Sequence, residues 1–342
     1  MSIALVKNRA KISLSVLLIA ALLSLALAGC IGSVAFTPVE LIKAVAELLN
    51  GSPPSLTATL LDLRLHRALT AFVTGGTLAL AGVLMQALLR NPLADPYVLG
   101  ISGGAAVGAL TAMFFLGMAW MVDLSAFGGA IAVAGLLFFL AYKDFKGSGT
   151  SEGSATTLLL TGVIVASGCM AVVALLLSIA PDSRLRSMVF WMIGDLSATQ
   201  SHYLNWIILL GVLVYVCSMA RAINVSALYS DSASTLGVSV GHLRKNLFFC
   251  AALLTASAVS TAGSIGFVGL IMPHACRFAL GPDHRLLLPA SCLAGGCFLV
   301  LADMLARTLI APQQLPVGVI TALIGVPVFL LQLHQHRQHH VR

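Results

Sequence analysis

Charged residues are scarce in this chain of 342 residues, in which Asp, Glu, Lys and Arg make up 9% and hydrophobic residues 59%. Soluble globular domains carry about 25% charged residues, which help to cover their surface. So few charges cannot cover a water-exposed surface of this size, and the mean hydropathy is +1.00. The composition therefore excludes an ordinary soluble domain and predicts that most of the outer surface contacts lipid.

Two motifs that would indicate a nucleotide or a nucleic acid are missing. The pattern GxxxxGK[ST] does not occur, so the chain binds no ATP through a P-loop. The formal net charge is +7, but no surface pattern of basic and aromatic residues accompanies it, so we expect no nucleic-acid partner. In a membrane protein the distribution of positive charges says more than their sum.

Paired cysteines and clustered metal ligands are missing too. The 7 cysteines are scattered through apolar segments and never form a CxxC pair, so we interpret them as small apolar residues rather than disulfides or metal ligands. His274 has no second ligand at suitable spacing, so a hydrogen bond at a helix end is its expected role. The histidines near the C-terminus are interpreted as a solvated tail, and adventitious metal binding is the alternative; they are His334, His336, His339 and His340. We expect no metal site and no cofactor.

No catalytic group or coupling acid stands out in the apolar segments. An intramembrane enzyme needs a nucleophile–base or metal pair at membrane depth, and no such pair has convincing spacing. Asp303 and Arg307 lie four residues apart on one expected helix face, where an ion pair is plausible. An ion-coupled secondary transporter usually needs ionisable groups or broken helices at the midplane. Their scarcity makes such a transporter the alternative, and favours a passage whose energy comes from another protein.

What the sequence does contain is a series of apolar segments long enough to cross a bilayer. Length and hydropathy predict an all-α polytopic membrane protein with about ten transmembrane helices in a single domain, residues 1–342. A weak echo between residues 80–92 and 261–273 indicates an inverted repeat. The expected spans are 12–34, 65–90, 98–118, 124–142, 156–180, 203–220, 247–263, 264–280, 286–307 and 317–333.

The first apolar segment has a second interpretation. Residues 27–30, Leu-Ala-Gly-Cys, resemble a lipoprotein cleavage site, which would make Cys30 a lipidated N-terminus. A first membrane helix is favoured because an otherwise polytopic chain needs no cleaved leader. The amphipathic segment 38–49 that follows is expected to lie outside, on the membrane surface.

The basic residues predict the orientation of the chain. An even number of spans places both termini on one side of the membrane. If that side is the cytoplasm, most of the 19 Lys and Arg residues are cytoplasmic, in agreement with the positive-inside rule. We therefore expect cytoplasmic termini. The exceptions on the outer side are Lys43, Arg64, Arg67, Arg184, Arg186 and Arg307.

Several motifs are specific enough to indicate a family. They are RLHR at 64–67, LALAGVLMQALLRNPLADP at 78–96, LGISGGA at 99–105, GFVGLIMPHACR at 266–277 and DHRLLLP at 283–289. Together they resemble the membrane permease of the FecCD-type ABC importers for vitamin B12, iron–siderophores and haem. The resemblance extends, with breaks, from about residue 62 to residue 331.

The resemblance implies a permease subunit in the bacterial inner membrane that makes and breaks no covalent bonds. It implies a homodimer that works with two copies of a cytoplasmic ATPase subunit and with a periplasmic substrate-binding protein. The cargo would be a metal chelate that is moved into the cytoplasm between the two permease copies. We expect an iron–siderophore first, and haem or cobalamin next.

The resemblance also implies roles for particular residues. Arg64, Arg67 and Arg307 would receive glutamates of the binding protein, although snorkelling or local pairing with Asp62 and Asp303 would also explain them. Residues 221–246, with short helices expected at 232–237 and 240–245, would dock onto the ATPase instead of being a solvated connector. The expected coupling residues are Asp231, Ser232, Leu236, Gly237, Val238 and Gly241.

Hydroxyl residues near the start of the fifth span are candidates for a translocation gate. Helix capping and bonding back to helix carbonyls would explain the same residues. The candidate gate residues are Ser154, Thr156, Thr157 and Thr161.

Three positions depart from the family pattern. His66 stands where the family usually has proline. Residues 229–231, Tyr-Ser-Asp, replace the usual Gly-Glu after Ala-Leu, so Asp231 would stand in for the acid. Gln314 replaces a glutamate before Leu-Pro-Val-Gly, which removes a negative charge from that outer loop.

Overall fold

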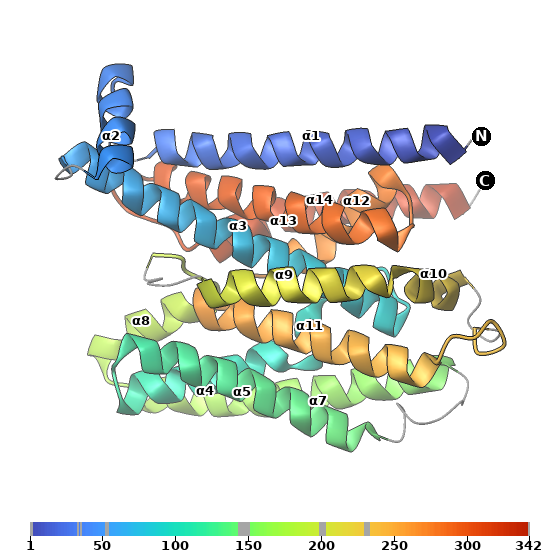
Figure 1. Cartoon of the computed structure of the whole chain (residues 1–342). Helices are drawn as coiled ribbons and strands as arrows, with labels where there is room; N and C mark the ends of the chain where they lie inside the picture. The colour runs from blue at the N-terminus through green and yellow to red at the C-terminus, as the bar shows by residue number, and fades with distance from the viewer. Residues whose placement is uncertain are drawn as a thin grey trace.

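The computed structural model of the chain describes residues 3–32, 34, 36–51, 55–142, 151–197, 203–228 and 233–340. These residues form helices and connecting turns and contain no β-strand. Most helices run along one common direction in a single bundle, and both chain ends lie at the same end of it, here termed the terminal end (Figure 1). The opposite end, where the short helix α2 (Pro38–Asn50) lies, is termed the far end (Figure 1). The predicted all-α class is confirmed.

The helices follow one another with short connections. A 3-10 turn, η1 (Pro96–Leu99), precedes the fourth helix. The helices are α1 (Ile3–Cys30), α2, α3 (Leu56–Leu89), α4 (Ile101–Phe115), α5 (Ala119–Leu140), α7 (Ser151–Ile179), α8 (Asp182–Ile193), α9 (Tyr203–Ser218), α10 (Ala220–Leu228), α11 (Val240–Ala262), α12 (Val268–Leu280), α13 (His284–Thr308) and α14 (Val317–His340).

Among the described residues, 6 helices are long and apolar enough to cross a membrane, namely α1, α3, α5, α7, α11 and α13. Helices α9 and α10 pass the same test together, but they bend by 57° at their junction. Three shorter apolar helices, α4, α12 and the first part of α14, occupy the other places where spans were expected. Each expected span therefore has a helix at its place, and the crossing of the short ones stays a prediction.

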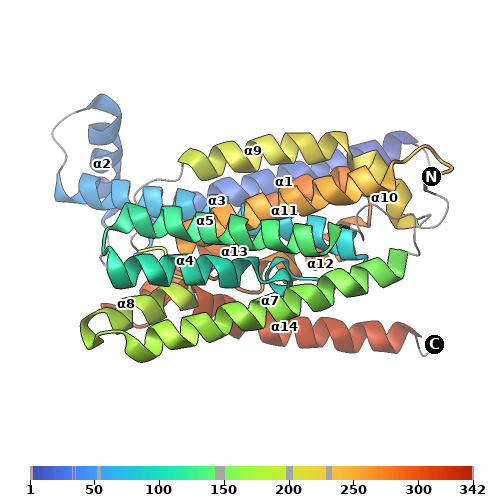
Figure 2. The same ribbon diagram turned by 90° about the horizontal axis from the view of Figure 1, so that it is seen from below.

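Helix α3 forms the centre of the bundle. It lies between α9 at one edge and α14 at the other, beside α13 (Figure 2). Almost all of its residues from Ala68 to Leu89 are buried. Glycines allow this contact, because a Cβ on Gly75 would overlap the carbonyl of Gly295 in α13, and a Cβ on Gly82 would overlap the carbonyl of Gly269 in α12.

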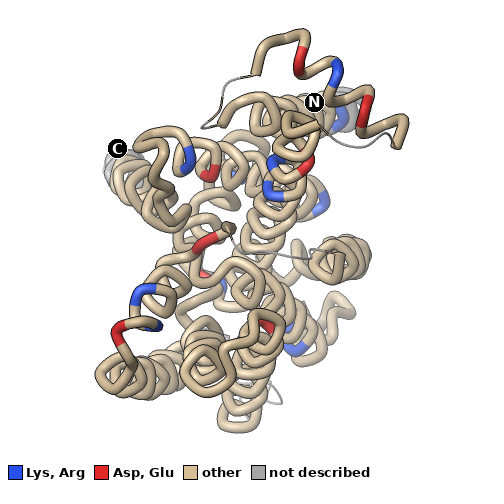
Figure 3. Tube along the Cα trace, turned by 90° about the vertical axis from the view of Figure 1, so that its left-hand side faces the viewer, with Lys and Arg blue, Asp and Glu red and all other residues tan. Residues whose placement is uncertain are grey.

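Charged residues interrupt the bundle at few places, as the view along its axis shows (Figure 3). Several helices nevertheless begin earlier than hydropathy predicts. Helix α3 starts at Leu56, where the Ser55 hydroxyl accepts the Ala58 N–H at 3.2 Å, and it includes Asp62 and Arg64. The helix therefore begins before the expected span of 65–90, because hydropathy excludes polar residues that continue the same helix. Where the membrane-crossing part begins stays a prediction.

Of the two short helices expected within residues 221–246, the one at 240–245 is helical but belongs to a longer helix, and the described residues 233–237 do not form the other. Residues 221–228 continue α10, and residues 240–245 are the first part of the long helix α11. The described residues 233–237 form turns, in which the Val238 N–H donates to the Ala233 carbonyl at 3.0 Å. Gly237 has φ +82°, a left-handed value that stops a helix and that glycine adopts without strain.

Helix α2 lies across the bundle direction at the far end (Figure 1). Thr37 and Glu40 form a capping box at its start, with Thr37 N–H donating to Glu40 Oε2 at 2.8 Å. These bonds lower the pKa of the Glu40 carboxyl below its usual value. The buried Ala44 faces α3, whereas Ile42 and Leu49 expose apolar side chains. This arrangement fits the expected surface helix, whose contact with lipid stays a prediction.

Candidate functional sites at the two ends of the bundle

An ion-pair cluster at the far end joins α3 to α13. Arg67 of α3 donates from Nε and Nη2 to Asp303 Oδ1 at 3.0 and 2.8 Å. Arg307, one helical turn after Asp303 on α13, places its Nε 3.0 Å from Asp303 Oδ2. The carboxylate is 1% exposed, so two guanidinium groups enclose it. The expected pair between Asp303 and Arg307 is confirmed.

Arg64 is held by the chain segment that links α1 to α2. Its Nη2 donates to the Val34 carbonyl at 2.6 Å and its Nη1 to the Cys30 carbonyl at 3.3 Å. The guanidinium also lies over the Phe36 ring, 4.1 Å from the centroid. Asp62 does not pair with Arg64, and instead lies 3.2 Å from His66 Nδ1. Arg64 therefore has a structural role in fixing the α1–α2 connection.

A hollow at the far end gathers the three arginines that the sequence singled out. It has a volume of about 310 Å³, and Gln314 enters it from the α13–α14 connection, accepting from Arg67 Nη1 at 2.8 Å. Arg67 is 14% exposed in its side chain and Arg307 8%. The hollow is positively charged, because its lining includes three arginines and no Asp or Glu. Its lining is Val34, Leu60, Leu63, Arg64, His66, Arg67, Leu196, Ser197, Arg307 and Gln314.

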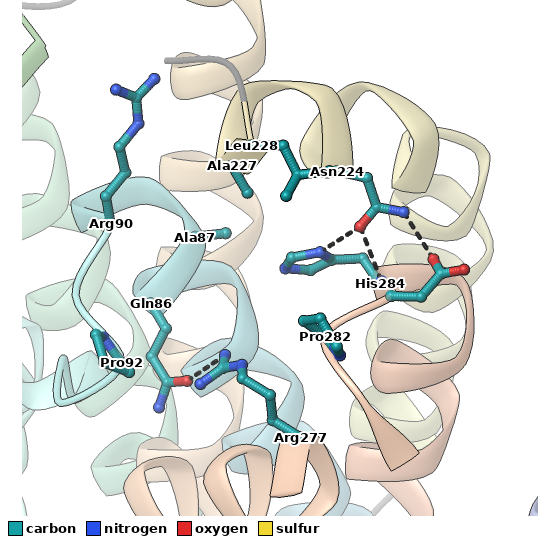
Figure 4. Close-up of a pocket in the computed structure, with 11 residues that line it drawn as sticks. Gln86, Ala87, Arg90, Pro92, Asn224, Ala227, Leu228, Arg277, Pro282 and His284 are labelled. Carbon is teal, nitrogen blue, oxygen red and sulfur yellow. Dashed lines mark hydrogen bonds between the residues drawn. The ribbon is translucent and has the colours of Figure 1, made fainter. Parts of the chain in front are cut away.

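A larger cavity opens at the terminal end, between α3, α10 and the turn from α12 to α13. Its volume is about 520 Å³. Asn224 and His284 lie on one side of it, and the pair of Arg277 and Gln86 lies on another (Figure 4). Arg277 Nη2 donates to Gln86 Oε1 at 2.8 Å. The lining is completed by Ala87, Arg90, Pro92, Ala227, Leu228, Pro282 and Asp283.

Asn224 ties helix α10 to the start of helix α13. Its Nδ2 donates to Asp283 Oδ1 at 2.6 Å, and its Oδ1 accepts the His284 N–H at 3.0 Å. Asn224 belongs to no recognisable sequence motif, although an asparagine close to a Gly-Pro-Asp-His turn in the fold would be a natural cap. Asn224 and His284 are 60 positions apart in the sequence, so no local pattern indicated that proximity.

The expected coupling residues follow Leu228, which lines this cavity, by a few positions in the sequence. Leu236 is 57% exposed on the turn at the terminal end, and Gly237 follows it with positive φ. Val238 and Gly241 are half-buried around the start of α11. Asp231 and Ser232 lie outside the described residues. The coupling role of these residues stays a prediction.

The expected gate residues all belong to α7. Thr156 and Thr157 are exposed, and Thr161 donates to the Thr157 carbonyl at 2.8 Å. That bond from a hydroxyl to a carbonyl of its own helix is the alternative explanation given for these residues, and it needs no gate. The side chain of Ser154 lies outside the described part. The gate stays a prediction, and no group of three or more potential metal-ligating side chains converges among the described residues.

Comparison with known proteins indicates a transport family. A model of the FecCD transport family matches residues 16–335. The hemin transport system permease protein HmuU of Yersinia pestis is 38% identical over 288 residues, which are 81% of this chain and 84% of that one. The vitamin B12 import system permease protein BtuC of Salmonella newport is 36% identical over 326 residues, 93% of each chain.

Other matches agree with these. The uncharacterized ABC transporter permease protein YvrB of Bacillus subtilis is 40% identical over 299 residues, covering 84% of this chain and 82% of that one. A solved structure, described as an inward-facing conformation of an ABC transporter of the metal-chelate type, superposes with a TM-score of 0.81 at 29% identity. It covers 95% of this chain and 99% of its own.

Proposed function

The chain belongs to the FecCD transport family, and we propose on this premise that it imports a metal chelate into the bacterial cytoplasm. The relatives are permease subunits of ABC importers, so the chain is a transport component rather than an enzyme. The observation that carries the cargo class is the near full-length similarity to permeases named for hemin and for vitamin B12. An iron–siderophore is the third chelate to be tested.

We propose that two copies of the chain enclose the passage and that two ATPase subunits and one binding protein complete the importer. Energy then comes from the ATPase, which agrees with the absence of a P-loop in this sequence. The positive hollow around Arg67 suits an acidic side chain of the binding protein, because a guanidinium fork matches a carboxylate. The exposed turn around Leu236, at the other end, suits docking of the ATPase.

The test is uptake into proteoliposomes. They contain this chain with its ATPase subunit, and the binding protein outside is loaded in turn with hemin, cobalamin or an iron–siderophore. Uptake of one chelate that requires ATP and the binding protein supports the proposal and names the cargo. Uptake driven by an ion gradient without ATPase would instead support a secondary transporter.

A further inference from the structure

Helix α10 is attached to the rest of the bundle through the side chain of Asn224. Oδ1 of Asn224 accepts two bonds from His284, one from the backbone N–H at 3.0 Å and one from the ring Nδ1 at 2.7 Å. Nδ2 donates to the Asp283 carboxylate at 2.6 Å. One amide therefore satisfies the first backbone donor of α13 and also contacts its N-cap acid.

These contacts fix the amide in one orientation. If it were turned over, its NH₂ group would face the His284 N–H, and its oxygen would face the Asp283 carboxylate. Because Oδ1 can only accept, His284 Nδ1 carries its proton towards Asn224. The contacts of Asn224 with Asp283 and His284 are termed the Asn224 joint. The joint needs a donor and an acceptor on one short side chain, which an asparagine supplies and an aspartate does not.

Helix α13 runs from this joint to the arginine cluster at the other end. It has 25 residues, so it extends about 37 Å at 1.5 Å per residue. Asp303 lies in its last turns and pairs with Arg67 of α3 and with Arg307 of the same helix. Between its two ends, the contact between Gly75 and Gly295 allows α13 to pack closely against α3. Helices α3 and α13 are therefore fastened to each other both in the middle and at the far end.

Helix α10 is the other partner in the joint. It ends at Leu228, a few residues before the exposed turn that carries Leu236, and it meets α9 at an angle of 57°. A second bond ties it to the end of α3, where Arg90 Nη2 donates to Ser226 Oγ at 3.3 Å. Displacement of the turn would reach α3 and α13 through these contacts.

We propose that Asn224 is a positioning residue for transport, which makes α10 move as one body with α3 and α13. This inference rests on the proposed function, because it assumes an ATPase at the turn and a binding protein at the arginine cluster. The joint transmits docking of the loaded binding protein to the ATPase, and ATP-driven motion of the turn back to the docking end. Coupling between two such sites typically amounts to about 5- to 150-fold in affinity.

The substitution N224D tests the joint. It keeps the size of the side chain but places two carboxylates within hydrogen-bonding distance, so the contact to Asp283 becomes repulsive. D283N alone is expected to be mild, since its oxygen still accepts from Asn224. The double variant N224D/D283N restores a donor opposite an acceptor, at the cost of the 3.0 Å bond from the Arg285 N–H. Partial rescue relative to N224D is therefore expected.

The matched control is N91D. It adds the same charge on an exposed turn after α3, where the side-chain oxygen keeps its 2.9 Å bond from the Leu93 N–H. For each variant, the reconstituted complex is assayed for basal ATP hydrolysis, for the fold stimulation of hydrolysis by the loaded binding protein, and for thermal unfolding. A residue that only supports folding would change the unfolding temperature and all activities together.

We expect N224D to lower the fold stimulation by roughly fivefold or more, with basal hydrolysis retained, and N224D/D283N to recover part of it. Wild-type stimulation in N224D overturns the inference, as does a loss that N224D/D283N does not relieve. If N224D does not fold, a folded N224D/D283N complex that is stimulated by the loaded binding protein supports the joint, and a folded N224D/D283N complex without stimulation overturns it. Failure of the proposed function is distinguished from failure of this inference by the wild-type complex. If that complex shows no ATP-dependent uptake, the proposed function itself is refuted.

Discussion

At the scale of single residues, the arginines of the far end differ in what they can do. Arg64 and Arg307 are 8% and 7% exposed, and both donate to backbone carbonyls of the α1 end. Reversing their charge would therefore disrupt the fold as well as any docking. Arg67 is the most accessible of the three in its side chain. The docking hypothesis is therefore tested at Arg67, with stability measured alongside because the same side chain pairs with Asp303.

Replacing Arg67 by glutamine should weaken binding of the loaded binding protein by roughly tenfold, because a charge-assisted pair is lost. Affinity is measured on the purified permease, with unfolding temperature as the check on structure. R186Q is the control, since Arg186 of α8 is an exposed arginine of the same end and stacks near Phe190. Equal affinities of R67Q and R186Q would contradict docking at Arg67.

Replacing Asp303 by asparagine should destabilise the permease by about 3–5 kcal/mol, because two largely buried guanidinium groups lose their counter-charge. Chemical unfolding in detergent measures the difference. D62N is the control, because Asp62 is 51% exposed and its surface pair with His66 is worth about 1 kcal/mol at most. A D303N protein as stable as D62N would show that the cluster adds little.

At the scale of elements, close packing of helix backbones positions both sites. Gly75 and Gly82 lie on α3 where α13 and α12 approach, and no side chain fits there. Without a hydrophobic driving force between helices in lipid, such contacts supply much of the association. The same packing sets the distance between Arg67 and Asp303 and between Gln86 and Arg277.

Replacing Gly82 by alanine should destabilise the bundle by about 1–3 kcal/mol, because the new Cβ overlaps the carbonyl of Gly269 and α12 must shift. The control is G135A in α5, where a Cβ meets nothing within 4 Å. Resistance to unfolding in detergent distinguishes the two variants. Equal resistance would mean that α12 accommodates the methyl group without strain.

Replacing Leu236 by serine should lower uptake and substrate-stimulated hydrolysis without changing the unfolding temperature, since the side chain is 57% exposed. A loss of roughly 1–2 kcal/mol of docking energy is expected for an apolar contact of this size. L116S, at a residue 52% exposed between α4 and α5, is the control. Wild-type stimulation in L236S would count against the coupling turn.

At the scale of the whole molecule, the two candidate sites lie at opposite ends of one bundle (Figure 1). An importer driven by ATP needs this separation, because the binding protein and the ATPase act on different sides of the membrane. Helices α3 and α13 reach both ends and are packed against each other. The bundle therefore provides a continuous helical connection between the two candidate sites.

The orientation of the bundle is tested with reporter fusions. Both chain ends lie at the terminal end, where the positive-inside rule predicts the cytoplasm. A fluorescent protein fused after Arg342 should therefore be bright, and alkaline phosphatase inserted at Gly51 of the far end should be active. The reversed pattern would invert the orientation and exchange the sides assigned to the two candidate sites.

The sequence by itself determined the properties that depend on local composition. Apolar length placed a helix at every expected span. The motifs indicated the family that the comparisons confirmed. Boundaries were less well predicted, because polar residues such as Asp62 and Arg64 continue a helix without contributing to hydropathy.

Only the tertiary structure decided which side chains meet. Arg67 and Asp303 are 236 residues apart, and Asn224 and His284 are 60 apart. Hydropathy is a property of one segment, whereas these contacts depend on which faces of two helices pack together. Glycine contacts set that packing, so the arginine cluster and the Asn224 joint became visible only once α3, α10 and α13 were placed in space.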